Sequence, residues 1–247
     1  ISSSLRIDSN NDRTAANTFA VDVAGFFQSE QTAFSDFDGR YRLGFNFQNL
    51  GPKINYDANV SDINANFLPA QMKLGGGFDF ILDSYNKVSV TAEFSKLLVP
   101  TPPLLGTFTD YNDVNGNGIF DEEEEQVGLP YTGIISGKPN DVDFLAGVFQ
   151  SFSDAPGGFS EELKEFTWAL GAEYLYEDSF ALRAGYFNEN EFKGARKFFS
   201  LGAGFKYTTI DIDLSYLFSA SKVQSPLENT LRFSLSFNIG DGEYTEY

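Results

Sequence analysis

The sequence contains no cysteine and no histidine among its 247 residues. Without these residues the usual zinc and copper sites are excluded, and so are the Ser-His-Asp and Cys-His catalytic triads. The lack of cysteine gives no firm indication of the redox compartment, because oxidising compartments also hold cysteine-free proteins. The chain therefore lacks the side chains on which many hydrolytic and metal-dependent reactions rely, and we expect no enzymatic activity.

Positive charge is scarce, with 17 Lys and Arg against 35 Asp and Glu, for a formal net charge of −18. A nucleic-acid partner would require a basic face, so none is expected. No run of about 18 apolar residues is present, and no transmembrane helix is predicted. These observations do not exclude a membrane β-barrel. Apolar and polar residues alternate along barrel strands, so the mean hydropathy of such a protein stays near neutral.

Apolar and polar residues alternate with a period of two along most of the chain. In 231–239, LRFSLSFNI, every odd position is apolar and every even position is polar, which is typical of a strand with one apolar and one polar face. The same alternation predicts further strands at 18–28, 40–48, 70–82, 87–97, 166–176, 179–187, 198–207 and 209–218, with the end of another at 1–6. The sequence thus predicts an all-β protein with about ten strands, one of them partial.

The connections between these strands alternate between short and long. Short ones fall near 29–38, 83–86, 177–178 and 207–209, and long ones cover 7–17, 49–68, 98–164, 188–197 and 219–228. Outer-membrane barrels follow this rule, with tight periplasmic turns and longer extracellular loops. We therefore expect a single transmembrane antiparallel β-barrel domain over 1–247, with 98–164 as a long extracellular loop insertion.

The two faces of the predicted strands differ in chemistry. The apolar face carries aromatic residues near strand ends, as interfacial girdles do: Trp168, Tyr174, Tyr176, Phe180, Tyr186, Tyr207, Tyr216 and Phe218. The polar face carries six cations and six anions: Arg40, Arg42, Lys73, Arg183, Lys206, Arg232, Asp22, Asp79, Glu93, Glu173, Asp211 and Asp213. We expect these charges to pair across a barrel interior, because lone buried charges are costly. A selectivity filter is the alternative, but it would favour one sign.

Within the long insertion, residues 141–152 place apolar side chains at helical spacing, and Asp141 is a candidate N-cap. Such a helix could cross the barrel mouth, enter the bilayer interface, contact a partner or pack on its own loop.

Residues 113–124, DVNGNGIFDEEE, match the twelve-residue calcium-loop pattern at every fixed position. The pattern assigns Gly118 to the sharp turn and predicts these metal ligands: Asp113, Asn115, Asn117, Ile119 through its carbonyl, Asp121 and Glu124. The sequence before the loop, PPLLGTFTDYN, does not favour the helix that precedes an EF-hand loop. The alternative is an acidic, glycine-rich loop that is simply solvated. We expect a structural calcium ion of modest affinity that stiffens an external loop.

Several long segments carry a family resemblance: FAVDVAGFFQSE (19–30), FNFQNLGPKINYD (45–57), FLPAQMKLGGGFDF (67–80), FSKLLVPTP (94–102), DAPGGFSEELKEFTWALGAEYLYEDSFALRAGYF (154–187), KGARKFFSLGAGFKY (193–207) and SPLENTLRFSLSFNIG (225–240). Together they resemble the PorV family, outer-membrane proteins of the type IX secretion system of Bacteroidetes. That family is similar to the FadL-like barrels, which have fourteen strands and an N-terminal region before them. The resemblance implies that this chain is the C-terminal two-thirds of a longer protein, although a closed ten-strand barrel is also conceivable.

The resemblance also implies a function. PorV-like proteins bind the C-terminal signal domain of secreted cargo, associate with the SprA (Sov) translocon barrel and carry cargo to the attachment complex that contains the PorU sortase. On this basis the long loops 98–164, 188–197 and 219–228 would contact partners, and the outer face would contact outer-membrane lipid. The alternatives are a FadL-like channel for hydrophobic compounds and a structural barrel that braces another barrel.

Overall fold

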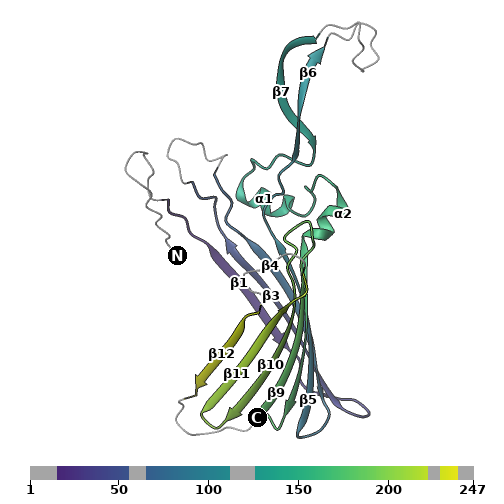
Figure 1. The fold of residues 1–247 in the computed structure, drawn as a ribbon, viewed down its shortest axis with the longest axis vertical. Helices are drawn as coiled ribbons and strands as arrows, with labels where there is room; N and C mark the ends of the chain where they lie inside the picture. Colours follow the sequence, from purple (N-terminus) through teal and green to yellow (C-terminus); the bar gives the residue numbers. More distant parts are fainter. Residues whose placement is uncertain (1–15, 56–64, 112–125, 222–228, 239–247) are drawn as a thin grey trace. The chain divides into compact units, whose positions relative to one another are not determined.

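The computed structural model describes residues 16–55, 65–111, 126–221 and 229–238. Twelve strands and three short helical segments lie in these ranges, and Figure 1 labels most of them. The strands are β1 (Val21–Gln28), β2 (Thr32–Ala33), β3 (Asp38–Leu50), β4 (Gln71–Ile81), β5 (Asn86–Leu97), β6 (Leu104–Tyr111), β7 (Gln126–Ser136), β8 (Phe166–Tyr176), β9 (Phe180–Asn188), β10 (Lys197–Tyr207), β11 (Ile210–Ser219) and β12 (Leu231–Phe237). The helical segments are α1 (Phe144–Gln150), α2 (Phe159–Glu162) and the 3-10 turn η2 (Leu163–Glu165).

The chain divides into two compact units, which are described separately. One unit comprises 21–50, 71–97 and 164–247, and the other comprises 1–20, 51–70 and 98–163. The first is called the sheet unit and the second the connection unit.

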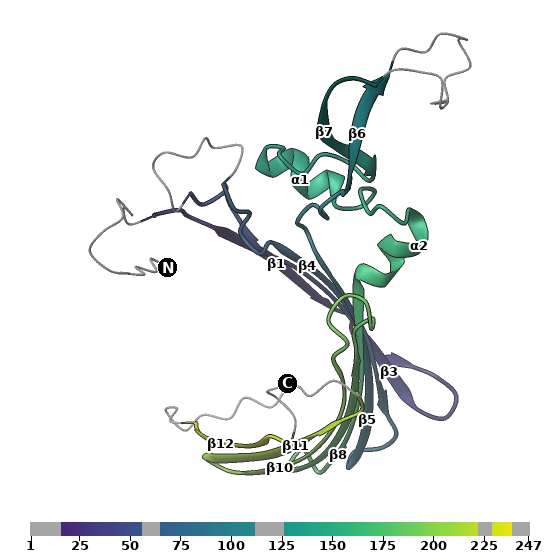
Figure 2. The same ribbon diagram turned by 45° about the horizontal axis from the view of Figure 1, so that its top comes forward.

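The sheet unit contains one antiparallel ten-stranded sheet. Its strands follow the order β1-β3-β4-β5-β8-β9-β10-β11-β12, and the short β2 pairs with β3. Figure 2 shows this sheet bending from β1 to β12. Nearly all neighbouring strands are also neighbours in sequence, and the registers run without interruption along most ladders, as between β4 and β5. The described residues contain no pairing between β1 and β12, so the sheet they form is an open one.

The predicted strands are confirmed wherever the structure describes them. Nine of the ten predicted segments correspond to β1, β3, β4, β5, β8, β9, β10, β11 and β12, with ends shifted by a few residues at most. The tenth, at 1–6, lies outside the described residues. The prediction missed β2, β6 and β7. The alternation predicts these strands correctly because each strand of the sheet has one apolar and one polar face. The sequence of such a strand shows a clear period of two.

The alternation of connection lengths is confirmed except between β1 and β3. That connection, 29–37, was expected to be short, but it is longer than the β9–β10 connection at 189–196. Short connections join β4 to β5 through 82–85, β8 to β9 through 177–179 and β10 to β11 through 208–209. Long ones join β3 to β4, β5 to β8, β9 to β10 and β11 to β12. Because neighbouring strands are antiparallel, these long connections leave one end of the sheet and these short turns lie at the other.

The connection unit contains a second, two-stranded sheet of β6 and β7, together with α1 and α2. Its other segments are joined by backbone contacts: Ile54 forms an isolated bridge with Asn66, and the Leu98 amide donates to the carbonyl of Ala70. The helix predicted over 141–152 is shorter than expected, and Asp143 occupies the N-cap position in place of Asp141. Asp143 makes no side-chain capping bond, so the helix lacks the capping interaction that the sequence led us to expect.

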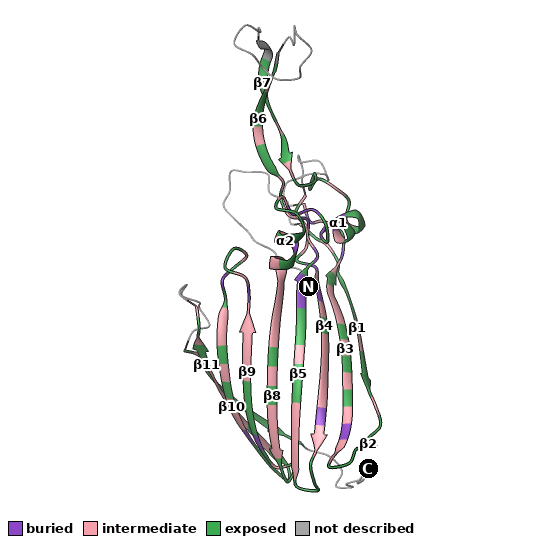
Figure 3. Cartoon of the chain, turned by 90° about the vertical axis from the view of Figure 1, so that its right-hand side faces the viewer, coloured by how far each residue is buried: buried purple, intermediate pink, exposed green. Residues whose placement is uncertain are grey.

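The described residues have little conventional core. Only seven apolar residues are buried, most of them small, whereas most large apolar side chains of the sheet are exposed. Figure 3 shows how rarely buried positions occur along the strands. Among the described residues, no helix is long and apolar enough to cross a membrane.

Candidate functional site

The apolar face of the sheet is open along its length. Large exposed side chains on this face include Leu43, Phe45, Leu74, Phe94, Leu170, Leu182, Phe199, Leu201, Phe205, Leu214, Phe233 and Leu235. A continuous apolar surface of this extent is not found on monomeric proteins in water, where patches rarely exceed a few hundred Å². A lipid-facing sheet requires such a surface.

Aromatic residues form two groups on this face. Near the long connections, Trp168 lies 5.4 Å from Tyr186, and Tyr186 lies 4.7 Å from Phe199, measured between ring centroids. Near the short turns, Phe78 lies 4.7 Å from Phe80, and Phe34 and Phe37 stack beside them.

The spacing of the two aromatic groups fits a bilayer. On β8, Trp168 and Tyr176 mark the two groups and are eight residues apart, which corresponds to about 26 Å along the strand. Between them on the same face lie Leu170, Ala172 and Tyr174. Aromatic residues near both ends of a strand with aliphatic residues between them are typical of outer-membrane strands.

The polar face carries an ion-pair network. Asp79 on β4 is buried, and its carboxylate accepts from Arg40 at 3.2 Å, from Arg42 at 2.6 Å and from the Ser89 hydroxyl at 2.7 Å. On the other half of the sheet, Arg183 pairs with Glu173 and with Asp213.

Arg40, Arg42, Asp79, Arg183, Glu173 and Asp213 therefore pair as expected, but they do so along one face of the sheet, and pairing across a closed interior stays a prediction. Within the part of the chain that is described, Lys73, Lys206 and Arg232 make no ion pair. Each pair joins a positive side chain to a negative one, so the charges neutralise each other. This favours a structural role over ion selection.

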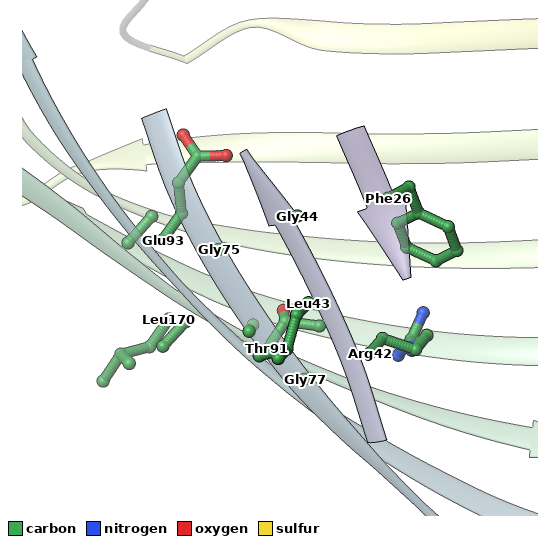
Figure 4. Close-up of a pocket in the computed structure, with 13 residues that line it drawn as sticks. Phe26, Arg42, Leu43, Gly44, Gly75, Gly77, Thr91, Glu93 and Leu170 are labelled. Atoms are coloured by element: carbon green, nitrogen blue, oxygen red, sulfur yellow. The ribbon is translucent and has the colours of Figure 1, made fainter. Parts of the chain in front are cut away.

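A hollow of about 390 Å³ lies where glycines of neighbouring strands meet. Figure 4 shows Gly44, Gly75 and Gly77 between Phe26 and Arg42 on one side and Glu93 on the other. Gly44 of β3 pairs with Gly75 of β4, so neither strand projects a side chain there. The hollow contains an arginine, a carboxylate and a threonine but no nucleophile paired with a base, so it offers a binding surface and no evident catalytic group.

The connection between β9 and β10, residues 189–196, is a tightly bonded loop. Glu189 is buried, and its carboxylate accepts two hydrogen bonds from the Arg196 guanidinium, both at 2.7 Å. These hydrogen bonds from Arg196 lower the pKa of Glu189 below its ordinary value, even though burial acts in the opposite direction. Gly194 has φ +148°, and a Cβ there would overlap the Glu189 carboxylate. Glycine is therefore strongly favoured at this position.

A second set of charges fixes the same loop to the end of the sheet. Lys193 donates to Glu165 at 2.9 Å, and Glu165 also pairs with the completely buried Lys96. At the tip, Phe192 is 81% exposed and lies under the Lys164 ammonium at 5.1 Å. A rigid loop thus presents one large aromatic side chain to its surroundings. Sequence reasoning assigned 188–197 only a general contact role, because partners such as Glu165 are distant in sequence.

Helix α1 in the connection unit is packed on one side and exposed on the other. Gly147 is buried, and a Cβ there would lie 2.6 Å from the Phe67 ring and 3.0 Å from Pro100. On the other side Leu145 and Phe149 are 66% and 76% exposed. The helix therefore packs on its own loops, one of the expected alternatives, and it leaves an apolar side uncovered.

The six expected metal ligands, Asp113, Asn115, Asn117, Ile119, Asp121 and Glu124, lie outside the described residues. The flanking strands are described: β6 and β7 pair up to Tyr111 and Gln126. No group of acidic residues able to hold a metal occurs in the ranges that the structure describes. Calcium binding thus stays a prediction, and its structural context is the end of a β-hairpin.

The protein is all-β, and an antiparallel sheet with one apolar face, one polar ion-paired face and long connections at one end is consistent with the outer-membrane barrel class. Residues 1–104 match the family described as type IX secretion system protein PorV. This match supports the PorV identification made from the sequence. The family implies an outer-membrane component of type IX secretion, and it is not a known enzyme family. No curated protein matches the chain significantly.

Proposed function

We propose that the protein is the type IX secretion subunit that binds the C-terminal signal domain of cargo, associates with the SprA (Sov) translocon and delivers cargo to the PorU-type attachment complex. The observation that carries this proposal is the PorV family match over residues 1–104. In this proposal the long connections face the cell exterior, and the apolar face contacts outer-membrane lipid or a neighbouring barrel.

The long connections provide the kind of surface that protein binding requires. The β9–β10 loop is held in one conformation by Glu189, Arg196 and Lys193, and it exposes Phe192. In the connection unit, α1 exposes Leu145 and Phe149. Preordered loops with large aromatic side chains bind partners at a low entropic cost, and such aromatics are frequent binding hot spots.

The polar face supports a binding protein more than an ion channel. Its strongest pairs, such as Asp79 with Arg40 and Arg42, neutralise one another. A protein that carries cargo along its outer end needs no conducting interior, whereas a selective pore requires an excess of one sign.

The test is a mild-detergent pull-down of the full-length protein from its own cells, followed by mass spectrometry. Recovery of a giant barrel protein and of secreted proteins that share a C-terminal domain is the expected result. A Phe192→Ser variant should lose part of this recovery, while a Tyr207→Ser variant at the opposite end of the sheet should keep it. Recovery of the barrel without any secretion component would reject the proposal.

A FadL-like channel for hydrophobic compounds is the second candidate. The glycine-lined hollow of about 390 Å³ favours it, because it could seat part of an acyl chain. Native mass spectrometry of the purified protein distinguishes the two: a stoichiometric bound lipid or hydrocarbon that is displaced by Gly75→Leu supports the channel.

We also propose a structural calcium ion in the loop 113–124, bound by the six residues named above. Strands β6 and β7 support this proposal, because Tyr111 pairs with Gln126 and the chain therefore enters and leaves the loop at one point. A twelve-residue loop that wraps one ion needs its first and last ligands close together. Calcium would neutralise part of the acidic run 121–125 and stiffen the end of the hairpin.

A further inference from the structure

Four lysines gather at the end of the sheet where the long connections leave. They are called the lysine cluster: Lys96 near the end of β5, Lys164 on η2, Lys193 in the β9–β10 loop and Lys197 at the start of β10. All four belong to the sheet unit. They make up four of the 17 Lys and Arg residues of a chain whose net charge is −18. The cluster therefore concentrates positive charge in an acidic protein.

The carboxylates within the cluster do not neutralise it. Lys96 and Lys193 share the single carboxylate of Glu165, and Lys197 donates to Glu191 at 2.9 Å. Four ammonium groups thus meet two carboxylates, which leaves an excess of two positive charges. The Glu189 carboxylate in the same loop adds no third anion to the cluster, because it is bound by both arms of the Arg196 guanidinium.

Lys164 contributes most directly to this excess. In the part of the chain that the structure describes, its ammonium group forms no ion pair and lies over the ring of Phe192 at 5.1 Å. The acids that precede it in sequence, Glu161 and Glu162, accept hydrogen bonds from the backbone amides of Gly157 and Ala155. An anion from outside the chain is therefore the partner that Lys164 lacks.

The strand registers place Lys197 beside the aromatic group of the apolar face. Lys197 on β10 and Trp168 on β8 both pair with Asn188 on β9, so the three residues form one row across the sheet. In the next row Phe199 pairs with Tyr186. Two residues along a strand span about 7 Å. The lysine thus begins where the Trp168, Tyr186 and Phe199 group ends.

This arrangement matches the boundary between hydrocarbon and headgroups. Tryptophan and tyrosine concentrate at the headgroup level of a bilayer. A lysine next to them can lay its aliphatic stem along the apolar surface and hold its ammonium group among the headgroups. Basic pockets at this depth bind anionic headgroups. Because an ammonium group offers three donors and a point charge, phosphate oxygens suit it well.

We propose that the lysine cluster binds the phosphate of a lipid headgroup, with Lys164, Lys193 and Lys197 contacting the phosphate oxygens and the buried Lys96 adding charge behind them. The acyl chains of this lipid lie along the apolar face below Trp168 and Phe199. This inference rests on the part of the proposed function that places the apolar face in lipid. It adds the headgroup chemistry and the residues that select it.

The experiment measures lipid retention by native mass spectrometry of the full-length protein in mild detergent. The added lipids are phosphatidic acid, which exposes an anionic phosphate, and phosphatidylcholine with the same acyl chains, in which a choline covers the phosphate. The protein should retain phosphatidic acid about ten-fold better, because each lysine near a lipid surface attracts an anionic lipid about five-fold. Equal retention of the two lipids would overturn the proposal.

A matched pair of double variants locates the site. Lys164→Gln/Lys197→Gln should lose the preference for phosphatidic acid, and Lys164→Arg/Lys197→Arg should keep it. Lys87→Gln/Lys206→Gln removes the same charge at the short-turn end of the sheet and should change the preference less than about two-fold. The Arg variant also separates loss of binding from loss of folding. Equal losses in the two Gln variants would mean that net charge, and not the cluster, selects the lipid.

Inorganic phosphate distinguishes a lipid site from a free-anion site. Phosphate ions at the concentration of the lipid should leave phosphatidic acid bound, because they gain no contact with the apolar face. Displacement at equal concentration would overturn the lipid assignment. The two levels of the proposal fail differently: retention of neither lipid contradicts the placement of the apolar face in lipid, whereas equal retention of both contradicts only the headgroup site.

Discussion

The ammonium group of Lys96 is completely buried and lies against the carboxylate of Glu165, which also accepts from Lys193 at 2.9 Å. One carboxylate thereby joins the end of β5, the start of β8 and the β9–β10 loop. Lys96 also lies 5.3 Å from the centroid of the Phe166 ring. Lys96, Lys193 and Glu165 meet where the sheet ends and the loop that exposes Phe192 begins.

Replacing Glu165 by glutamine should destabilise this end of the sheet, because it removes the carboxylate that the buried Lys96 ammonium group contacts. Breaking a buried ion pair from one side typically costs about 3–5 kcal/mol. Lys96→Met should cost less, because the Glu165 carboxylate that remains keeps its ion pair with Lys193. Fluorescence of Trp168, the only tryptophan, can report unfolding of both variants in denaturant. A smaller effect for Glu165→Gln than for Lys96→Met would contradict this explanation.

The β9–β10 loop should depend on Gly194 more than on other strained glycines. In Gly194→Ala the new methyl group would overlap the Glu189 carboxylate. Gly158, at φ +67°, is a suitable control, because a Cβ there would have no atom within 4 Å. Both alanine variants incur backbone strain, about 1–3 kcal/mol, but only Gly194→Ala should also accelerate amide hydrogen exchange across 189–197. Equal local exchange in the two variants would show that the overlap is relieved without cost.

The bond between Glu189 and Arg196 should make the loop sensitive to acid. The pKa of Glu189 is lowered in the folded protein, chiefly by hydrogen bonds from Arg196. This stabilisation is therefore fully present above the ordinary glutamate pKa of about 4.3 and is lost as the pH falls through the lower folded value. Unfolding free energies of the wild type and of Glu189→Gln should differ at pH 7 and converge at the acid end. If the difference in unfolding free energy does not depend on pH, the ionised Glu189 carboxylate is not its cause.

An arginine substitution should destabilise the protein much more on the apolar face of β10 than on its polar face. Leu201 lies on the apolar face between Phe199 and Phe205, whereas the neighbouring Ser200 lies on the polar face beside the Gly185 backbone. Arginine at Leu201 should destabilise the protein in lipid vesicles by about 2–4 kcal/mol, and arginine at Ser200 should have a much smaller effect. Denaturant titration of both variants in the same vesicles tests this directly, and similar losses would mean that the apolar face is not in lipid.

The sheet could be predicted from the sequence because its strands alternate strictly. The charged network was predictable as a set, since Arg40, Asp79 and Arg183 all lie at polar-face positions. Lys96 could not be predicted. Lys96 is two residues from Phe94 on β5, so the alternation assigned it to the apolar face. Its partner Glu165 is 69 residues away in the chain.

The hairpin of β6 and β7 was missed for a different reason. The segments GTFTDY and LPYTGIIS contain the β-branched and aromatic residues typical of strands, but the acidic, glycine-rich sequence between them suggested a continuous loop. Treating that sequence as a hairpin turn would have revealed both strands.

Calcium binding can be tested at the end of that hairpin. Chelation should accelerate hydrogen exchange in 110–130 and leave 189–197 unchanged, because only the first region contains the expected ligands. Glu124→Gln removes the bidentate ligand at the twelfth position and should reproduce the effect without chelator. Glu122→Gln removes the same charge at a position that is not a ligand, so it should behave as wild type. Identical exchange with and without chelator, or equal effects of the two variants, would leave 113–124 as a solvated acidic turn.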